Sequence, residues 1–296
     1  MSVLVLGASG QLATHLRGLL PNAVYWGKEK LDLRQPPDVR AAIEAHRPSV
    51  IVNAAAYTAV DKAESERDAA WTVNAEAPAM IGRAAAVLDV PLIHISTDYV
   101  FDGTKSGEYE VSDPCNPLCV YGASKLGGEL AVRTMSPKSW ILRTSWVFSE
   151  FGANFVKTIL RLADEREDLR IVADQVGRPT YAGDLAELVA RMVERRDGTR
   201  LPFGTYHAVG GAVTSWHGFA EAIVAAGVRH KRLVRAPRVT AIATSDYPTP
   251  ARRPANAALL PSIELSSIFN VEFDWMRGLD SAVRRLGESP QRSPGG

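Results

Sequence analysis

Short apolar runs alternate with longer amphipathic stretches along the first half of the chain. The apolar runs are typical of buried strands, and the amphipathic stretches repeat apolar residues at helical spacing. The predicted strands are 3–6, 23–26, 50–53, 92–96 and 140–143, and the predicted helices between them are 12–20, 37–46, 68–88 and 125–134. Apolar strands that alternate with helices favour a parallel sheet covered on both faces. The fold class that we expect is therefore α/β, with a doubly wound parallel sheet.

The second half has a less regular pattern, which favours a smaller α/β lobe packed on the strand ends. Helices are predicted at 154–164, 182–195 and 215–226, and Ser215 is a suitable N-cap for the last of them. The segment 233–256 is rich in Pro and Arg and is expected to be extended chain and loop. We therefore predict one domain over 1–150, joined by parts of 170–200, and a second over 151–296 that ends in a frayed tail at 289–296.

A glycine-rich turn, GASGQLA, follows the first predicted strand and opens the first predicted helix. Small residues allow a tight turn and the close approach of a pyrophosphate, and the helix N-terminus offers N–H groups to that anion. The pattern alone is weak in a chain with 23 glycines, but its position between strand and helix makes it informative. It predicts a Rossmann-like dinucleotide site. The residues expected at the cofactor are Gly7, Ser9, Gly10, Gln11 and Leu12.

The acidic residue that usually follows about 20 positions later in such sites is absent. Lys28 and Lys30 follow the second predicted strand instead. A lysine here either meets the 2′-phosphate of NADPH or is a solvated loop charge. Asp32 and Leu33 come next, where the carboxylate and the apolar side chain could hold an adenine. The predicted cofactor is therefore NADPH, with NADH possible.

Tyr121 and Lys125 are four residues apart, so on a helix their side chains share one face. A free tyrosine has a pKa of about 10, and a neighbouring ammonium lowers it. Such a tyrosine can donate a proton to a carbonyl oxygen while hydride reaches the carbon. Thr97 ends a predicted strand, and ligands in open α/β sheets lie beyond the carboxyl ends of strands. We therefore predict Thr97, Tyr121 and Lys125 as catalytic residues.

Together these motifs resemble the extended short-chain dehydrogenases/reductases. Several segments are similar, more narrowly, to the dTDP-4-dehydrorhamnose reductases: GASGQLA at 7–13, AAAYTAVD at 54–61, STDYVFDG at 96–103, YGASKLGGE at 121–129, RTSWVF at 143–148, DQVGRPTYAGDL at 174–185 and RPAN at 253–256. The resemblance implies hydride transfer from NADPH to C4 of dTDP-4-dehydro-L-rhamnose, which gives dTDP-L-rhamnose.

The resemblance also implies roles for individual residues. Tyr121 would donate the proton, Lys125 would lower its pKa and bind the nicotinamide ribose, and Thr97 would bond the reacting oxygen. Four residues after the third predicted strand would line the cofactor cleft, although the alanines among them could equally be ordinary core: Ala54, Ala55, Ala56 and Tyr57.

Six further residues are candidates for the substrate side. Asp98 and Tyr99 follow Thr97, and Tyr99 stands where related 4,6-dehydratases carry the glutamate needed for elimination. Trp146 is either a flat wall for the deoxysugar or a buried core residue. Asn154 either donates to the diphosphate or caps a helix. Arg178 and Arg253 either pair with the diphosphate or are solvated charges.

Composition narrows the range of partners. There are 34 Lys and Arg against 33 Asp and Glu, a net charge of +1, so the basic excess of a nucleic-acid or membrane-surface binder is missing. The expected partner is a small nucleotide sugar.

Cys115 and Cys119 cannot form a disulfide framework and indicate a reducing, cytoplasmic location. Their C-x3-C spacing lacks a second ligand pair, and no metal site is predicted. No apolar run approaches the roughly 20 residues of a membrane helix, and the chain is expected to be a monomer or homodimer.

Two other functions stay open at this point. Another nucleotide-sugar 4-ketoreductase or an epimerase would share the fold, because these motifs do not encode sugar stereochemistry. A non-catalytic subunit, such as the regulatory subunit of methionine adenosyltransferase, also resembles the family. The presence of Thr97, Tyr121 and Lys125 together argues against a pure scaffold.

Overall fold

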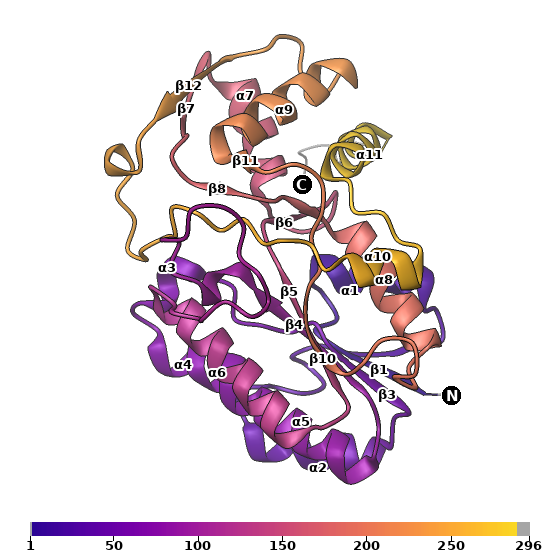
Figure 1. Cartoon of the computed structure of the whole chain (residues 1–296). Coiled ribbons are helices and arrows are strands. Elements are labelled where there is room, and N and C mark those ends of the chain that lie inside the picture. Colours follow the sequence, from indigo (N-terminus) through magenta and orange to yellow (C-terminus); the bar gives the residue numbers. More distant parts are fainter. Residues whose placement is uncertain (1, 289–296) are drawn as a thin grey trace.

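A six-stranded parallel sheet runs through the larger part of this computed structural model, which describes residues 2–288 (Figure 1). Its strand order is β10-β5-β4-β3-β1-β2. Strand β2 pairs with one edge of β1 and β3 pairs with the other, so the order of the strands across the sheet reverses at β1. The strands are β1 (Val3–Leu6), β2 (Val24–Trp26), β3 (Val50–Asn53), β4 (Leu92–Thr97), β5 (Ser139–Thr144) and β10 (Gly204–His207). The doubly wound sheet and its five predicted strands are confirmed, and β10 adds an edge strand that was not predicted.

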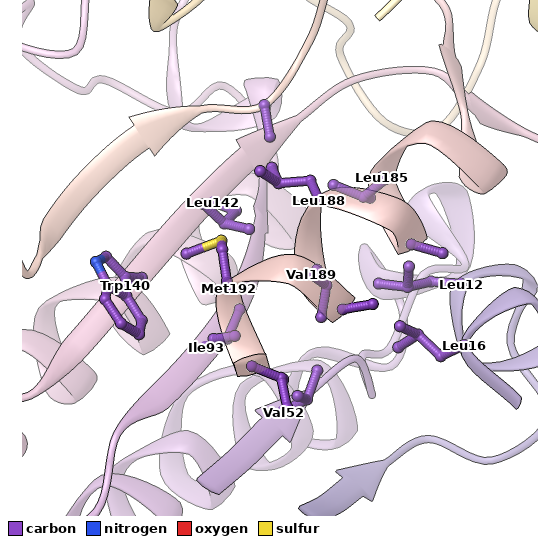
Figure 2. Close-up of a cluster of buried hydrophobic side chains, with 14 of the residues drawn as sticks. Leu12, Leu16, Val52, Ile93, Trp140, Leu142, Leu185, Leu188, Val189 and Met192 are labelled. Atoms are coloured by element: carbon purple, nitrogen blue, oxygen red, sulfur yellow. The ribbon is translucent and has the colours of Figure 1, made fainter. Parts of the chain in front are cut away.

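Helices bury their apolar faces against both sides of the sheet. On one side, α1 (Gln11–Leu19) and α8 (Ala182–Glu194) enclose a cluster that includes Leu16, Val52 and Trp140 (Figure 2). On the other, α2 (Pro36–His46), α5 (Ala77–Leu88) and α6 (Val120–Met135) cover Leu4, Leu6 and Ile51. Each fully buried side chain of this size contributes about 1.5–3 kcal/mol, so the sheet is a rigid base for its carboxyl edge.

A third hydrophobic cluster lies beyond the carboxyl ends of the strands, in the upper part of Figure 1. It is formed by α7 (Phe155–Glu165), α9 (Trp216–Arg229) and α11 (Trp275–Glu288). The parallel pair β7 (Asp168–Val172) and β12 (Arg238–Ile242) packs there as well. The shorter pairs are β6 (Val147–Phe148) with β9 (Thr180–Tyr181) and β8 (Val176–Gly177) with β11 (Thr214–Ser215), while α10 (Ile263–Phe269) returns to the first cluster.

The predicted division into 1–150 and 151–296 stays a prediction. The packing does show that α8 and β10, both beyond residue 150, belong to the core around the sheet. The predicted frayed tail at 289–296 lies outside the described residues. Across residues 2–288, no helix is both long and apolar enough to cross a membrane.

The helix predicted at 68–88 is interrupted by a π-helical turn. Helix α4 (Arg67–Trp71) leads into this turn at Thr72–Glu76, and α5 follows with Pro78 in its first turn. Proline has no N–H to continue a regular helix ladder, and π-turns of this kind redirect a side chain. Here the redirected residue is Asn74, which is buried and takes part in the site described below.

One other predicted boundary was wrong. Helix α6 begins at Val120 rather than at 125, because the thiol of Cys119 acts as its N-cap and accepts the Gly122 N–H at 3.5 Å. Cysteine is not among the usual capping residues, so the start was not visible in the sequence. The segment 233–256, predicted to be extended chain and loop, contains strand β12.

Helix α6 packs so closely on the π-helical turn that only glycine fits at Gly128. A Cβ there would overlap the carbonyl oxygen of Asn74. Gly128→Ala is therefore expected to lower the free energy of unfolding by about 1–3 kcal/mol. The matched control is Gly18→Ala in α1, where a Cβ meets nothing within 4 Å and stability is expected to rise by about 0.5–1 kcal/mol. Urea denaturation of both variants measures this, and equal stability of Gly128→Ala and the wild type would contradict the packing.

Candidate active site

The chain turns sharply after β1 and contacts the segment that follows β3. Gly7 has a φ of +100°, and its N–H donates to the carbonyl oxygen of Trp26 at 2.9 Å. A Cβ on Gly7 would lie 2.8 Å from the Ala55 nitrogen, so the turn requires glycine. Gly10 precedes α1 in an extended conformation and provides no side-chain cap. The first N–H groups of α1 therefore have no side-chain cap, and such helix N-termini favour anions.

A cavity of about 440 Å³ runs from this turn across the ends of β1, β2 and β3. The predicted Asp32 and Leu33 line it, together with Lys28 and with Arg34, which sequence reasoning missed. The Arg34 guanidinium donates to Asp32 through Nε at 3.0 Å, and these bonds lower the pKa of Asp32 to about 2. Lys30 does not line the cavity. The residues that line this first cavity are 6–10, 26–28, 31–34, 54–58 and 73.

A second cavity, of about 590 Å³, shares part of this wall and contains the predicted catalytic residues. Ser9, Gly10 and the three alanines 54–56 line both cavities, so the two are continuous. Thr97, Tyr121 and Lys125 line the second one. Gln11, Leu12, Asp98, Tyr99, Trp146 and Asn154 line it as well.

Tyr121 reaches Thr97 because α6 begins against the end of β4. A Cβ on Gly122 would overlap the carbonyl oxygen of Tyr99, so glycine permits this approach. The rings of Tyr99 and Tyr121 meet edge to face, with centroids 5.4 Å apart. The Thr97 hydroxyl donates to Asp98 Oδ1 at 2.9 Å and accepts the Tyr99 N–H at 3.3 Å.

Burial dominates the electrostatics of the Tyr–Lys pair. Desolvation raises the pKa of Tyr121 above its usual value, and a hydrogen bond with Thr97 opposes that rise. Lys125 is 2% exposed, donates from Nζ to the Ile95 carbonyl oxygen at 2.7 Å, and has its pKa lowered by burial to about 8. In this arrangement it is Thr97 that opposes the rise in the Tyr121 pKa. The predicted action of Lys125 on that pKa therefore stays a prediction.

A buried ion pair, Glu129 with Arg143, lies one helical turn after Lys125. Glu129 follows Lys125 by four residues on the same face of α6 and accepts from Arg143 Nη2 at 2.8 Å and from Ser96 Oγ at 2.5 Å. Its charge raises the pKa of Lys125 and so offsets part of the desolvation. Cys115 joins this network through Sγ, which accepts from Arg143 at 3.2 Å. The spacing of positions 121, 125 and 129 is the signal from which Glu129 could have been found.

Asn74 fixes the loop that carries Tyr57. Its Oδ1 accepts the Tyr57 N–H at 2.8 Å, and its Nδ2 donates to the Tyr57 carbonyl oxygen and to Ser124 Oγ, both at 3.0 Å. The hydroxyl of Tyr57 donates to Glu66 at 2.6 Å. Asn74 thus ties the wall of the first cavity to α6, and no local sequence signal marks it, because its position depends on the π-helical turn.

A third cavity, of about 610 Å³, opens on the far side of Tyr99 and Trp216. Trp216 also lines the second cavity, so the two adjoin. The predicted Arg253 lines the third cavity and bonds Asp61 through Nη2 at 2.9 Å. Its other basic and aromatic lining residues, none of them predicted, are Phe155, Arg166, Arg170 and Tyr247.

The remaining predicted residues have mixed outcomes. Trp146 lines the second cavity and stacks on Trp216, with centroids 3.6 Å apart. Asn154 caps α7 by accepting the Lys157 N–H at 3.2 Å, and it also donates to Gln11 Oε1 at 3.0 Å, so the capping alternative is present. Arg178 is buried and ion-paired with Glu108, and it lines none of the three cavities.

No group of three or more His, Cys, Asp or Glu side chains within residues 2–288 is arranged to hold a metal ion.

Comparison with known proteins extends over nearly the whole chain. The family model described as RmlD substrate binding domain matches residues 1–287. The dTDP-4-dehydrorhamnose reductase of Aggregatibacter actinomycetemcomitans is 45% identical over 97% of this chain and 99% of its own length. A dTDP-4-dehydrorhamnose reductase structure from Clostridium acetobutylicum has a TM-score of 0.88 at 33% identity and covers 97% of this chain and 99% of that one.

A second solved structure, the dTDP-4-dehydrorhamnose reductase of Bacillus anthracis in complex with NADP, has a TM-score of 0.86 at 33% identity. It covers 95% of this chain and 98% of that one. The family model and the relative from Aggregatibacter actinomycetemcomitans both cover nearly the whole chain, and the family model includes the glycine turn after β1 as well as Thr97, Tyr121 and Lys125. The chain therefore belongs to the family of the dTDP-4-dehydrorhamnose reductases.

Proposed function

We propose that this chain uses NADPH to reduce the C4 carbonyl of dTDP-4-dehydro-L-rhamnose to the alcohol of dTDP-L-rhamnose. The observation that carries the proposal is the meeting of Thr97, Tyr121 and Lys125 in a cavity continuous with the glycine turn after β1. Membership of the dTDP-4-dehydrorhamnose reductase family supports it.

The first cavity fits the cofactor. Gly7 lets the turn pack against the backbone of Ala55, where no Cβ would fit, and the N-terminus of α1 offers N–H donors to a pyrophosphate at this end of the cavity. Lys28 and Arg34 place two positive charges at the other end, where a 2′-phosphate would be neutralised. When bound, NADPH supplies the hydride, and NADH stays the predicted alternative.

Tyr121 and its neighbours provide the proton and hold the reacting oxygen. Reduction of a ketone adds a hydride to carbon and a proton to oxygen, and the Tyr121 hydroxyl is the proton source in this cavity. Thr97 is a hydroxyl donor to the same oxygen, which stabilises the charge that develops there. A protonated Lys125 in the same cavity favours the resulting phenolate.

The third cavity suits the nucleotide half of the substrate. Arg166, Arg170 and Arg253 supply positive charge for a diphosphate, and Tyr247 and Phe155 supply aromatic surface for a base. Trp146 and Trp216 form the stacked wall between this cavity and Tyr121, where the deoxysugar would lie. Arg178, which was a candidate for the diphosphate, lines none of the three cavities and is ion-paired with Glu108.

A cytoplasmic location and a monomeric or homodimeric state stay predictions.

Oxidation of NADPH in the presence of dTDP-4-dehydro-L-rhamnose tests the proposal. We expect turnover with the wild type and a fall in kcat of about 10²–10⁴-fold with Tyr121→Phe, because the proton donor is lost while the ring remains. The affinity for NADPH, measured by fluorescence titration, is expected to stay within about twofold in this variant. Tyr206→Phe is the matched control: Tyr206 lies on β10, and its hydroxyl donates to the carbonyl oxygen of Pro202.

Three results would contradict the proposal. Conversion of the sugar nucleotide without net oxidation of NADPH would indicate an epimerase. Binding of the nucleotide without any turnover would indicate a non-catalytic subunit. Wild-type turnover by Tyr121→Phe would remove that residue as the proton donor.

Arg253 provides a test of the nucleotide cavity. Arg253→Gln is expected to weaken the binding of dTDP by about 10-fold or more, because a charge-assisted bond to phosphate is lost. Isothermal titration calorimetry with dTDP measures the effect, and the neighbouring exposed Arg252→Gln is the matched control. Equal weakening in both variants, or none in Arg253→Gln, would place the nucleotide elsewhere.

A further inference from the structure

The carboxyl group of Asp98 lies buried at the inner end of the second cavity. Its residue is 2% exposed, although it lines the same cavity as Tyr121. Oδ1 accepts the Thr97 hydroxyl at 2.9 Å, while Oδ2 is buried without a hydrogen-bond partner among the described residues. A buried carboxylate oxygen without a partner is costly, so this environment favours the neutral acid.

The Thr97 hydroxyl has one proton and two lone pairs, and three groups compete for them. These groups are the carboxyl of Asp98, the N–H of Tyr99 at 3.3 Å, and the hydroxyl of Tyr121. An ionised Asp98 has no proton and forces Thr97 to donate to it. Tyr99 and Tyr121 then occupy both lone pairs of Thr97, and neither hydroxyl directs a proton into the cavity.

A neutral Asp98 reverses the direction of these hydrogen bonds. Its O–H donates to Thr97, and the Tyr99 N–H takes the second lone pair. The Thr97 proton is then available to the substrate oxygen or to Oη of Tyr121, and the Tyr121 proton is released from Thr97. Donation by Thr97 to Tyr121 also stabilises the phenolate that forms when Tyr121 gives up its proton.

We propose that Asp98 acts in its neutral form as a positioning residue, which donates a hydrogen bond to Thr97 and thereby directs the hydroxyls of Thr97 and Tyr121 toward the substrate oxygen. The inference rests on the proposed function. Asp98 transfers no proton in the reaction: the hydride and the Tyr121 proton are the two hydrogens that the carbonyl gains.

The groups around Asp98 are consistent with a neutral acid near pH 7. Burial outweighs the hydrogen bond from Thr97 and the smaller influence of the nearby Asp98 and Tyr99 backbone N–H groups, and raises the pKa of Asp98 to about 7. The titratable groups that face it are Tyr99 from its own turn and Tyr121 from α6. The other titratable groups of this region are two cations and a thiol. Lys125 bonds the Ile95 carbonyl oxygen, Arg253 lowers the pKa of Tyr99, and Cys119 raises the pKa of both tyrosines.

The sign of the pH dependence follows from this arrangement. Asp98 is protonated below pH 7, where the productive hydrogen bonds are present, and they are lost as the pH rises through its pKa of about 7. The kcat of the wild type is therefore expected to fall by about tenfold per pH unit above that value. The KM should change less, because the effect acts on the donors to the reacting oxygen.

The test compares the pH profiles of Asp98→Asn and Asp98→Leu. The amide of Asp98→Asn donates at every pH, so kcat at pH 6 should stay within about threefold of the wild type. The alkaline fall should move from near pH 7 to above about pH 8, where Lys125 loses its proton. Asp98→Leu has a similar volume and no donor, so kcat should fall about 10–100-fold at all pH values while NADPH affinity is retained. Asp164→Asn, at an exposed position of α7, is the matched control and should keep the wild-type profile.

A measurement without substrate separates this inference from the proposed function. Infrared difference spectra of the wild type against Asp98→Asn should show the carbonyl stretch of a protonated carboxylic acid at pH 6, and that band should disappear above pH 8. Absence of the band at pH 6, or the same alkaline fall in Asp98→Asn as in the wild type, would overturn the role of Asp98. Absence of turnover in the wild type, with the band present, would overturn the proposed reaction and leave the neutral acid in place.

Discussion

The contact between the first turn of α6 and the end of β4 is the constraint on which the site depends. Gly122 lies against the Tyr99 carbonyl oxygen, where no larger residue fits. This contact brings Tyr121 to Thr97, and the helical repeat then carries Lys125 and Glu129 along the same buried face. If α6 began even slightly further from β4, the tyrosine would meet solvent instead of the threonine.

A buried face with this much polarity needs internal partners. Lys125 finds the Ile95 carbonyl oxygen, and Glu129 finds Arg143 and Ser96. Low exposure also strengthens each electrostatic effect. It raises the pKa of Tyr121, lowers that of Lys125 to about 8 and raises that of Asp98 to about 7. Three ionisable groups in one cavity are thus moved away from their solution behaviour by the same cause.

The parts of the molecule that follow from local pattern could be predicted from the sequence. The apolar runs identify the strands. The glycine turn and the Tyr–Lys pair are each recognised from residues that lie within a few positions of one another. Because parallel strands present their carboxyl ends on one edge, Thr97 and the Gly7 turn had to face the same cleft.

The remaining features depend on partners that are distant in sequence. Arg178 is ion-paired with Glu108, and Asn154 bonds Gln11, which lies 143 positions earlier in the chain. Asn74 depends on a π-helical turn, and Trp216 depends on how α9 packs beside Trp146. No spacing rule connects such pairs, so their roles appeared only in the folded chain.

The central claim is that hydride is delivered to a sugar carbonyl beside Tyr121. NADPH carrying deuterium at the transferable C4 position of its nicotinamide tests this most directly, with dTDP-4-dehydro-L-rhamnose as substrate and NMR of the product as the readout. We expect a single deuterium on C4 of the sugar in dTDP-L-rhamnose. A product without deuterium at that carbon, or label at another sugar carbon, would contradict it.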